Sequence, residues 1–134
     1  MLNPKVVLTV DDDPLVHLMV EAFFRNNGAQ EIITASDGAD GLRKLDGREA
    51  DIDLIVVDLN MPLLDGVGFL RALRTALELY VVWTVVLTTS DQSEILGAAR
   101  EAGADEVFVK PQSQQELATI AARMLDGALR VRSR

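Results

Sequence analysis

Residues 6–14 read VVLTVDDDP, an apolar run that ends in three aspartates and a proline. The run Val6–Val10 is short, apolar and mostly β-branched, which is typical of a buried strand. Asp13 and Pro14 then indicate the start of a helix, because aspartate is a favoured N-cap and proline is favoured at the first helical position. The segment therefore predicts a buried strand that passes directly into a helix.

Apolar runs of this kind recur along the chain and alternate with stretches of helical period. The predicted strands cover residues 6–10, 32–35, 54–57, 84–87 and 107–109. The predicted helices cover residues 14–27, 39–45, 66–76 and 92–102, and a fifth begins at Ser113 and continues through Leu125. Strands that are continuously apolar are expected in a parallel sheet covered on both faces. The alternation predicts an α/β fold with right-handed crossovers and helices on both sides of the sheet.

The helical period also predicts which side chains face the core. In the first helix we expect an inward face made of Leu15, Leu18, Met19, Ala22 and Phe23. In the third helix we expect Phe69, Leu70 and Leu73 to point inward. Gly28 and Gly103 are the predicted stops of the first and fourth helices, and Ser113 with Glu116 forms a predicted capping box.

Composition limits the number of domains and the kinds of partner. A chain of 134 residues suits one domain, which we place at residues 1–127, followed by a short basic tail at residues 128–134. The formal net charge of −8 argues against nucleic acid or an anionic membrane as a partner, because phosphate groups would be repelled. The chain has no cysteine, no leader-like segment after Met1, and no apolar run near the roughly 20 residues of a membrane span. We therefore expect a cytoplasmic protein.

Polar side chains follow four of the five predicted strands, at the point where each strand ends. They are Asp11 and Asp12 after the first strand, Asp58 after the third, Thr88 and Thr89 after the fourth, and Lys110 after the fifth. The carboxyl ends of parallel strands meet at one edge of the sheet, where ligands bind in open α/β folds. Grouped carboxylates suit Mg²⁺, whose charge would also offset their mutual repulsion. The sequence therefore predicts a magnesium site at this edge.

The same group of side chains fits phosphoryl transfer to an aspartate. Asp58 is the candidate nucleophile, since a carboxylate can attack phosphorus and form an acyl phosphate. Mg²⁺, the Lys110 amine and the Thr88 hydroxyl are the kinds of group that stabilise charge on the transferred phosphoryl oxygens. Asp13, as the N-cap of the first helix, has a structural role instead.

The motifs VDDDP, VVDLNMPLLDG, VVLTTSD and GADEVFVKP occur in this order between about residue 5 and about residue 125. Together they resemble the receiver domain of two-component response regulators, a family that includes the single-domain chemotaxis regulator. The resemblance covers nearly the whole chain and is specific because all four motifs stand in register. It implies a flavodoxin-like, doubly wound fold: a five-stranded parallel sheet in the order 2-1-3-4-5, flanked by five helices.

Residue by residue, the resemblance implies that Asp58 is the phosphoacceptor. It implies that Asp12, Asp58 and the backbone carbonyl of Asn60 bind Mg²⁺ directly, while Asp11 holds a coordinated water. Of the two threonines it selects Thr88 as the hydroxyl that moves toward the phosphoryl group, and it makes Lys110 the cation that contacts this group.

Three further positions near the site match the family pattern. The Lys110-Pro111 bond resembles the family's cis peptide, which would direct the lysine into the site. Pro62 belongs to the loop after the phosphoacceptor, and Gly66 would free the backbone at the start of the third helix. Where many receivers have an aromatic residue on the fifth strand, this chain has Val107, which puts an aromatic switch in doubt; we expect Phe108 on the opposite face.

The resemblance implies a signalling domain that is not an enzyme beyond its own phosphorylation and dephosphorylation. Its partners would be a sensor histidine kinase or phosphotransfer protein and a downstream target protein. A homodimer through the fourth helix, fifth strand and fifth helix is a further expectation. Two alternatives remain open: a pseudo-receiver that binds partners without phosphorylation, and a flavodoxin-like cofactor binder.

Two aromatic residues have less specific interpretations. His17, within the first helix, is predicted to be an ordinary surface residue. Trp83 is predicted to pack at the entrance of the fourth strand, although a surface apolar patch that contacts a partner is the alternative.

Overall fold

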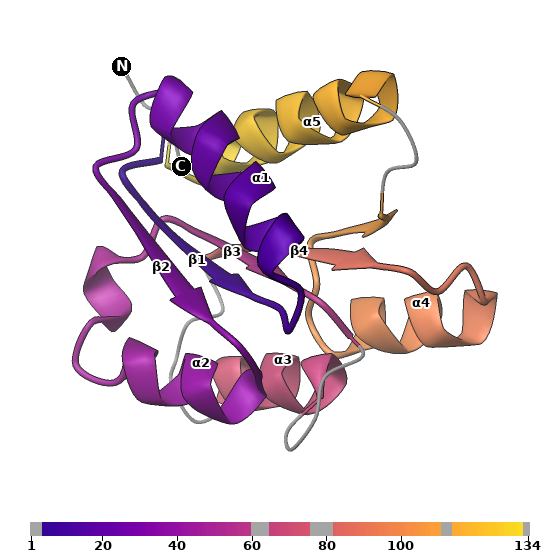
Figure 1. Ribbon diagram of the computed structural model, residues 1–134. Coiled ribbons are helices and arrows are strands. Elements are labelled where there is room, and N and C mark those ends of the chain that lie inside the picture. The colour runs from indigo at the N-terminus through magenta and orange to yellow at the C-terminus, as the bar shows by residue number, and fades with distance from the viewer. Residues whose placement is uncertain (1–3, 60–64, 76–81, 111–113, 133–134) are drawn as a thin grey trace.

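The computed structural model describes residues 4–59, 65–75, 82–110 and 114–132 and contains one parallel sheet of five strands. The strands are β1 Val6–Val10, β2 Glu31–Ala35, β3 Leu54–Val57, β4 Trp83–Thr88 and β5 Glu106–Val109. Their order in the sheet is β2-β1-β3-β4-β5, with every neighbouring pair parallel (Figure 1). The predicted fold class is therefore confirmed.

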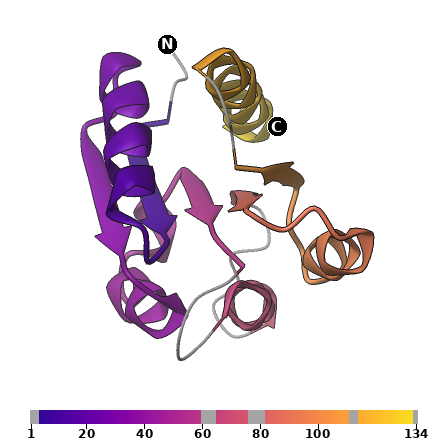
Figure 2. The same ribbon diagram turned by 45° about the vertical axis from the view of Figure 1, so that its right-hand side comes forward.

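Helices alternate with the strands and cover both faces of the sheet. They are α1 Pro14–Asn26, α2 Gly38–Leu45, α3 Gly66–Thr75, α4 Ser93–Glu101 and α5 Gln114–Arg132, with a short 3₁₀ helix at Glu49–Asp51 that the sequence pattern did not predict. Helices α1 and α5 lie on one face, and α2, α3 and α4 lie on the other (Figures 1 and 2). The strands and helices α1 to α4 begin and end within one residue of their predicted bounds. No helix in these described ranges is long and apolar enough to cross a membrane.

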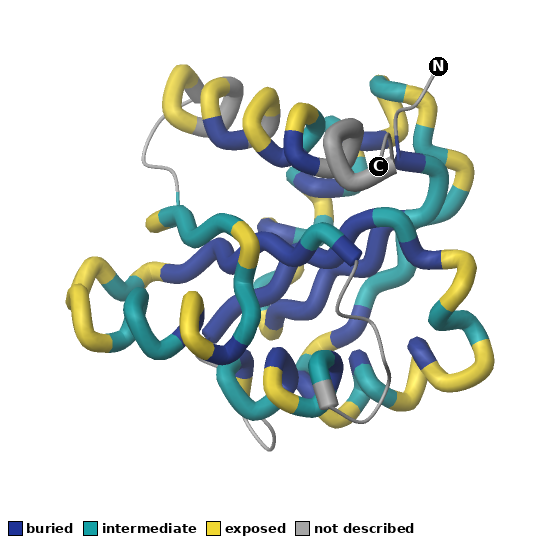
Figure 3. Tube along the Cα trace, turned by 180° about the vertical axis from the view of Figure 1, so that it is seen from behind, coloured by how far each residue is buried: buried dark blue, intermediate teal, exposed yellow. Residues whose placement is uncertain are grey.

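The core consists of two apolar clusters, one on each face of the sheet. One cluster joins α1 and α5 to the sheet, and the other includes the predicted inward residues Phe69, Leu70 and Leu73 of α3. Figure 3 shows that the buried residues concentrate in the strands and on the sides of the helices that face them. Val107 packs against the α3 cluster and Phe108 packs against the α1–α5 cluster, so the predicted alternation along β5 is confirmed.

The predicted inward face of α1 is correct for Met19 and Phe23, which pack against the α1–α5 cluster, and wrong for Leu15, Leu18 and Ala22. The helix buries Val16, Val20 and Phe24, whereas Leu15 and Leu18 are 72% and 62% exposed. The helix is rotated by about one residue from the prediction, or about 100°. Apolar residues occupy most positions between 15 and 24. The helical period therefore did not select one face, and packing against the sheet decides it.

The ends of α1 follow the predicted chemistry. Asp13 is the N-cap, and its carboxylate accepts a hydrogen bond from the Leu15 N–H at 3.0 Å. Gly28 follows the helix with φ +94°, a conformation that costs glycine little and other residues more. The predicted capping box of α5 includes Ser113, which lies outside the described residues, and α5 itself extends to Arg132.

Trp83 packs at the start of β4, as one of the two interpretations predicts. Its indole contacts the α1–α5 cluster, and Gly127 of α5 lies so close that a Cβ there would overlap the Trp83 ring. The neighbouring residues 80 and 81, which belong to the alternative surface patch, lie outside the described residues.

Candidate functional site

The register of the sheet places the polar side chains at one edge. Val10 at the end of β1 pairs with Val57 at the end of β3, and the Asp58 N–H donates to the Val10 carbonyl at 2.9 Å. Asp11 and Asp58 therefore leave two adjacent strands side by side. On the other side of β3, the backbone N–H of Lys110 donates to the Thr88 carbonyl at 2.6 Å, which places both residues at the same edge.

Three carboxylates meet at this edge. Asp11, Asp12 and Asp58 each have a carboxylate oxygen within 4.8 Å of the other two. Asp11 and Asp58 are 2% and 4% exposed, and Asp12 is exposed to solvent. Asp11 accepts a hydrogen bond from the Asp13 N–H at 2.9 Å, and Asp58 accepts one from the Leu59 N–H at 2.8 Å. The Asp12 carboxylate has no hydrogen-bond partner among the residues that the structure describes.

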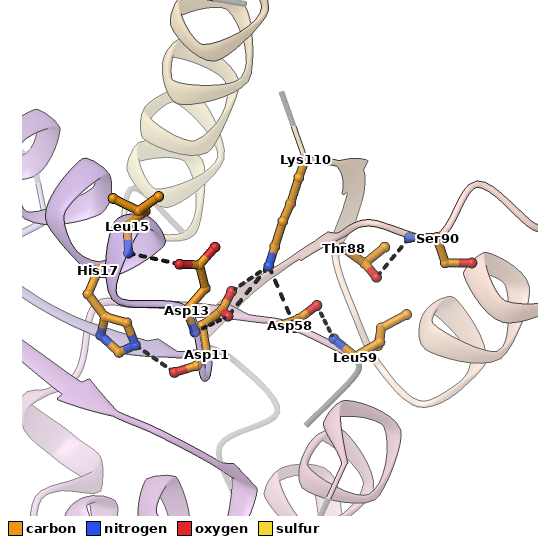
Figure 4. A network of polar contacts seen from close by, with 9 residues as sticks. All are labelled: Asp11, Asp13, Leu15, His17, Asp58, Leu59, Thr88, Ser90 and Lys110. Carbon is orange, nitrogen blue, oxygen red and sulfur yellow. Dashed lines mark hydrogen bonds and ion pairs between the residues drawn. The ribbon is translucent and has the colours of Figure 1, made fainter. Parts of the chain in front are cut away.

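Lys110 extends toward the acidic cluster from the end of β5 (Figure 4). Its Nζ lies 3.1 Å from an oxygen of Asp11 and 3.6 Å from an oxygen of Asp58. Burial alone would lower the pKa of Lys110, but the hydrogen bond to Asp11 and the charges of Asp11 and Asp58 raise it above the ordinary value for lysine. This environment therefore favours the charged form of the amine, which lies nearer to Asp11 than to Asp58.

Thr88 is fully buried at the end of β4, whereas the adjacent Thr89 is exposed. The Thr88 hydroxyl oxygen accepts a weak hydrogen bond from the Ser90 N–H at 3.3 Å. Figure 4 shows Thr88 at the same edge of the sheet as Asp58 and Lys110.

The donor set fits a hard divalent cation. Three carboxylates face one ammonium group, so these four described side chains carry a net charge of −2 when all are ionised. Burial raises the pKa of the Asp11 carboxyl, so keeping this group ionised costs free energy in the absence of a further cation. Carboxylate oxygens at this spacing are the ligands that Mg²⁺ and similar cations prefer. Asp11, Asp12 and Asp58 are therefore the residues that would hold one.

Gly66 supports the site through close packing. A Cβ on Gly66 would overlap the carbonyl oxygen of Asp58 and would lie 2.6 Å from the Cα of Leu59. The first turn of α3 thus packs directly on the backbone of Asp58 and Leu59. The structure therefore gives a different reason for this glycine from the predicted backbone freedom: there is no room for a side chain.

Sequence reasoning missed the role of His17. Instead of an ordinary surface side chain, the structure shows a half-buried imidazole whose Nε2 donates a hydrogen bond to the Asp11 backbone carbonyl at 2.6 Å. The available signal was its position one turn after the N-cap, because helical side chains point back toward the helix N-terminus. Asn60, Pro62 and Pro111 lie outside the described residues, so their predicted roles, including the cis peptide at Pro111, stay predictions.

Comparisons with known proteins agree with this geometry. The family model described as the response regulator receiver domain matches residues 7–122. The chain is 41% identical over 111 residues to the transcriptional regulatory protein PrrA of Mycobacterium tuberculosis, covering 83% of this chain and 46% of PrrA. It therefore spans about half the length of that relative.

Solved structures of response regulators match this chain over most of its length. The chemotaxis protein CheY4 of Vibrio cholerae is 31% identical with a TM-score of 0.76, and the match covers 90% of this chain and 98% of CheY4. The Mn²⁺-bound form of response regulator Rcp1 is 25% identical with a TM-score of 0.75, covering 88% of this chain and 89% of Rcp1.

Proposed function

We propose that this chain, which belongs to the response regulator receiver domain family, accepts a phosphoryl group on Asp58 in a Mg²⁺-dependent reaction. The donor would be a sensor histidine kinase or a phosphotransfer protein, and phosphorylation would change the binding of a downstream target protein. The observation that carries the proposal is the meeting of three carboxylates, one lysine and one buried threonine at a single edge of the sheet. A cytoplasmic location is part of the same proposal.

The bound cation would neutralise charge on the phosphoryl oxygens while Asp11, Asp12 and Asp58 hold it. The hard carboxylate oxygen donors of these residues suit that role, and a protein of the same fold, the response regulator Rcp1, is known in a Mn²⁺-bound form. A carboxylate oxygen of Asp58 would form the new bond to phosphorus as the bond between phosphorus and the donor breaks. No proton needs to leave Asp58, because the ionised carboxylate is the nucleophile.

Lys110 and Thr88 would respond to the new phosphoryl group. The Lys110 amine lies 3.6 Å from Asp58 and 3.1 Å from Asp11, so it can exchange one carboxylate for phosphoryl oxygens by a small movement. Among the residues that the structure describes, the Thr88 hydroxyl oxygen accepts only a weak hydrogen bond from the Ser90 N–H, so its own proton is available to the phosphoryl group. Both residues adjoin α4 and β5, so their movement would alter the surface of α4, β5 and α5, which would bind the target or a second copy of the chain.

A small phosphodonor tests the reaction without a kinase. With acetyl phosphate and Mg²⁺, we expect the wild-type protein to gain one phosphoryl group that is stable in acid and labile in base, the behaviour of an acyl phosphate. With EDTA in place of Mg²⁺, we expect no adduct. Intact-mass spectrometry measures both reactions, and an adduct of equal yield in EDTA would contradict the metal requirement.

Helix α1 presents a candidate docking face for the phosphodonor. Leu15 and Leu18 are exposed on the helix that starts at the acidic cluster, and Val109, next to Lys110, is 40% exposed. Leu18 also lines an open pocket together with Asp12 and His17. Large apolar side chains exposed around a reactive group are typical of a surface that a protein partner covers.

We expect the double variant Leu15→Gln, Leu18→Gln to slow phosphotransfer from the cognate kinase by about tenfold or more, the effect of losing an interface contact of ~1.4 kcal/mol. Its rate with acetyl phosphate should stay at the wild-type value, because neither leucine side chain has a polar group that could bind the cation or the phosphoryl group. Ala22→Gln, on an exposed position of the same helix, is the matched control. Equal slowing with both donors would contradict a docking role.

A further inference from the structure

We propose that His17 is a positioning residue that holds the acidic turn, residues 11–13, in the conformation that binds a divalent cation. The inference rests on the proposed function, because it concerns the cation that phosphorylation of Asp58 requires. Its basis is the distance of 2.6 Å between His17 Nε2 and the Asp11 carbonyl oxygen (Figure 4). A carbonyl oxygen only accepts hydrogen bonds, so the proton of this contact lies on Nε2.

The contact matters because little else fixes Asp12. Asp11 is held by its N–H, which donates to the Ala35 carbonyl at 3.0 Å, and by its carboxylate, which accepts from the Asp13 N–H at 2.9 Å. The Asp12 carboxylate has no hydrogen-bond partner within the described ranges. Its position is therefore set by the backbone, and the peptide that leads from Asp11 to Asp12 is the one whose carbonyl His17 binds.

Helix α1 places the imidazole over the acidic turn. The backbone nitrogen of His17 lies 3.5 Å from the Asp13 carbonyl oxygen, in the first turn of the helix. Helical side chains point back toward the N-terminus, so the ring lies near the acidic turn. The His17 side chain is half-buried. Without this donor, the Asp11 carbonyl would have to bind water, and the peptide before Asp12 would lose a direct hydrogen bond that fixes its orientation.

Metal titration of three variants tests this role. Mg²⁺ and Mn²⁺ are titrated into the wild type, His17→Phe and His17→Gln by calorimetry. We expect His17→Phe to lose about tenfold in affinity for both ions, the usual effect of removing a group that orients a metal ligand. His17→Gln should recover most of the affinity, because its amide can donate to the same carbonyl. Ala22→Gln, at an exposed position of the same helix, should bind both ions like the wild type.

Two further measurements separate positioning from a general effect on folding. The free energy of unfolding in EDTA should be nearly the same for His17→Phe and His17→Gln, although their metal affinities differ. In the metal-free wild type, ¹H–¹⁵N spectra of the imidazole should show a proton on Nε2 that exchanges slowly with solvent. This second measurement needs no variant, so it holds even if His17→Phe does not fold.

Three results would overturn the inference: wild-type metal affinity in His17→Phe, equal loss in His17→Phe and His17→Gln, or an imidazole without a proton on Nε2. If the wild type itself binds neither ion, the proposed function fails together with the inference. If the wild type binds the ions and His17→Phe binds them equally well, only the inference about His17 fails.

Discussion

Asp58→Asn is expected to gain no phosphoryl group from acetyl phosphate in the presence of Mg²⁺. The amide that replaces the carboxylate has almost the same shape, but it is a poor nucleophile and carries no charge to bind a cation. The amide oxygen can still accept the hydrogen bond that the Leu59 N–H donates at 2.8 Å. We therefore expect the variant to keep its fold and to lose only the ability to accept a phosphoryl group. Intact-mass spectrometry gives the yield of the adduct, and circular dichroism checks the fold.

Asp65→Asn is the matched control for this variant. It makes the same substitution at an exposed aspartate, whose carboxylate accepts from the Gly68 N–H at 2.9 Å at the start of α3. Asparagine serves this N-cap position as well as aspartate does. The control should gain the adduct as fast as the wild type. An adduct on Asp58→Asn at the wild-type rate would show that another residue is the phosphoacceptor.

Asp12→Ala is expected to abolish Mg²⁺ binding, whereas Asp13→Ala should leave it largely intact. Asp12 offers a carboxylate with no hydrogen-bond partner in the described part of the chain, and it lies within 4.8 Å of the carboxylates of Asp11 and Asp58. Asp13 instead accepts from the Leu15 N–H at 3.0 Å as the N-cap of α1. Losing this cap should cost about 1 kcal/mol of stability. Calorimetric titration with Mg²⁺ and thermal unfolding in EDTA measure the two effects.

The two neighbouring variants serve as controls for each other. Both remove one negative charge from the same turn, so a general electrostatic effect on Mg²⁺ would be similar in the two. Asp12→Ala also relieves repulsion within the metal-free cluster and should not destabilise the protein in EDTA. If Asp13→Ala abolishes Mg²⁺ binding and Asp12→Ala loses the helix cap, the assigned register is wrong by one residue.

Much of the fold could be predicted because the strands are short apolar runs that are easy to recognise in the sequence. The runs Val6–Val10 and Leu54–Val57 are continuously apolar and bounded by charged residues, so their predicted limits agree with the structure. The buried face of α1 could not be predicted, because apolar residues surround the helix and only contact with the sheet selects Val16 and Val20 over Leu15. Sequence pattern identifies an element more reliably than the face that it buries.

The meeting of Asp11, Asp58 and Lys110 at one edge of the sheet could be predicted from the sequence. Parallel strands bring their carboxyl ends together, so the order of Asp11, Asp58 and Lys110 along the chain implies that they meet. The preference of Lys110 for Asp11 over Asp58 depends on distances that no local pattern contains. The hydrogen bond of His17 likewise depends on how α1 sits against the acidic turn.

The most direct test of the central claim is to locate the phosphoryl group chemically. After reaction with acetyl phosphate and Mg²⁺, borohydride reduces an aspartyl phosphate to homoserine, which peptide mass spectrometry detects at its position in the chain. We predict homoserine at position 58, and none when EDTA replaces Mg²⁺. Homoserine at another aspartate, or a phosphoryl group that resists borohydride because it is bound to His17 or a hydroxyl, would contradict the proposed function.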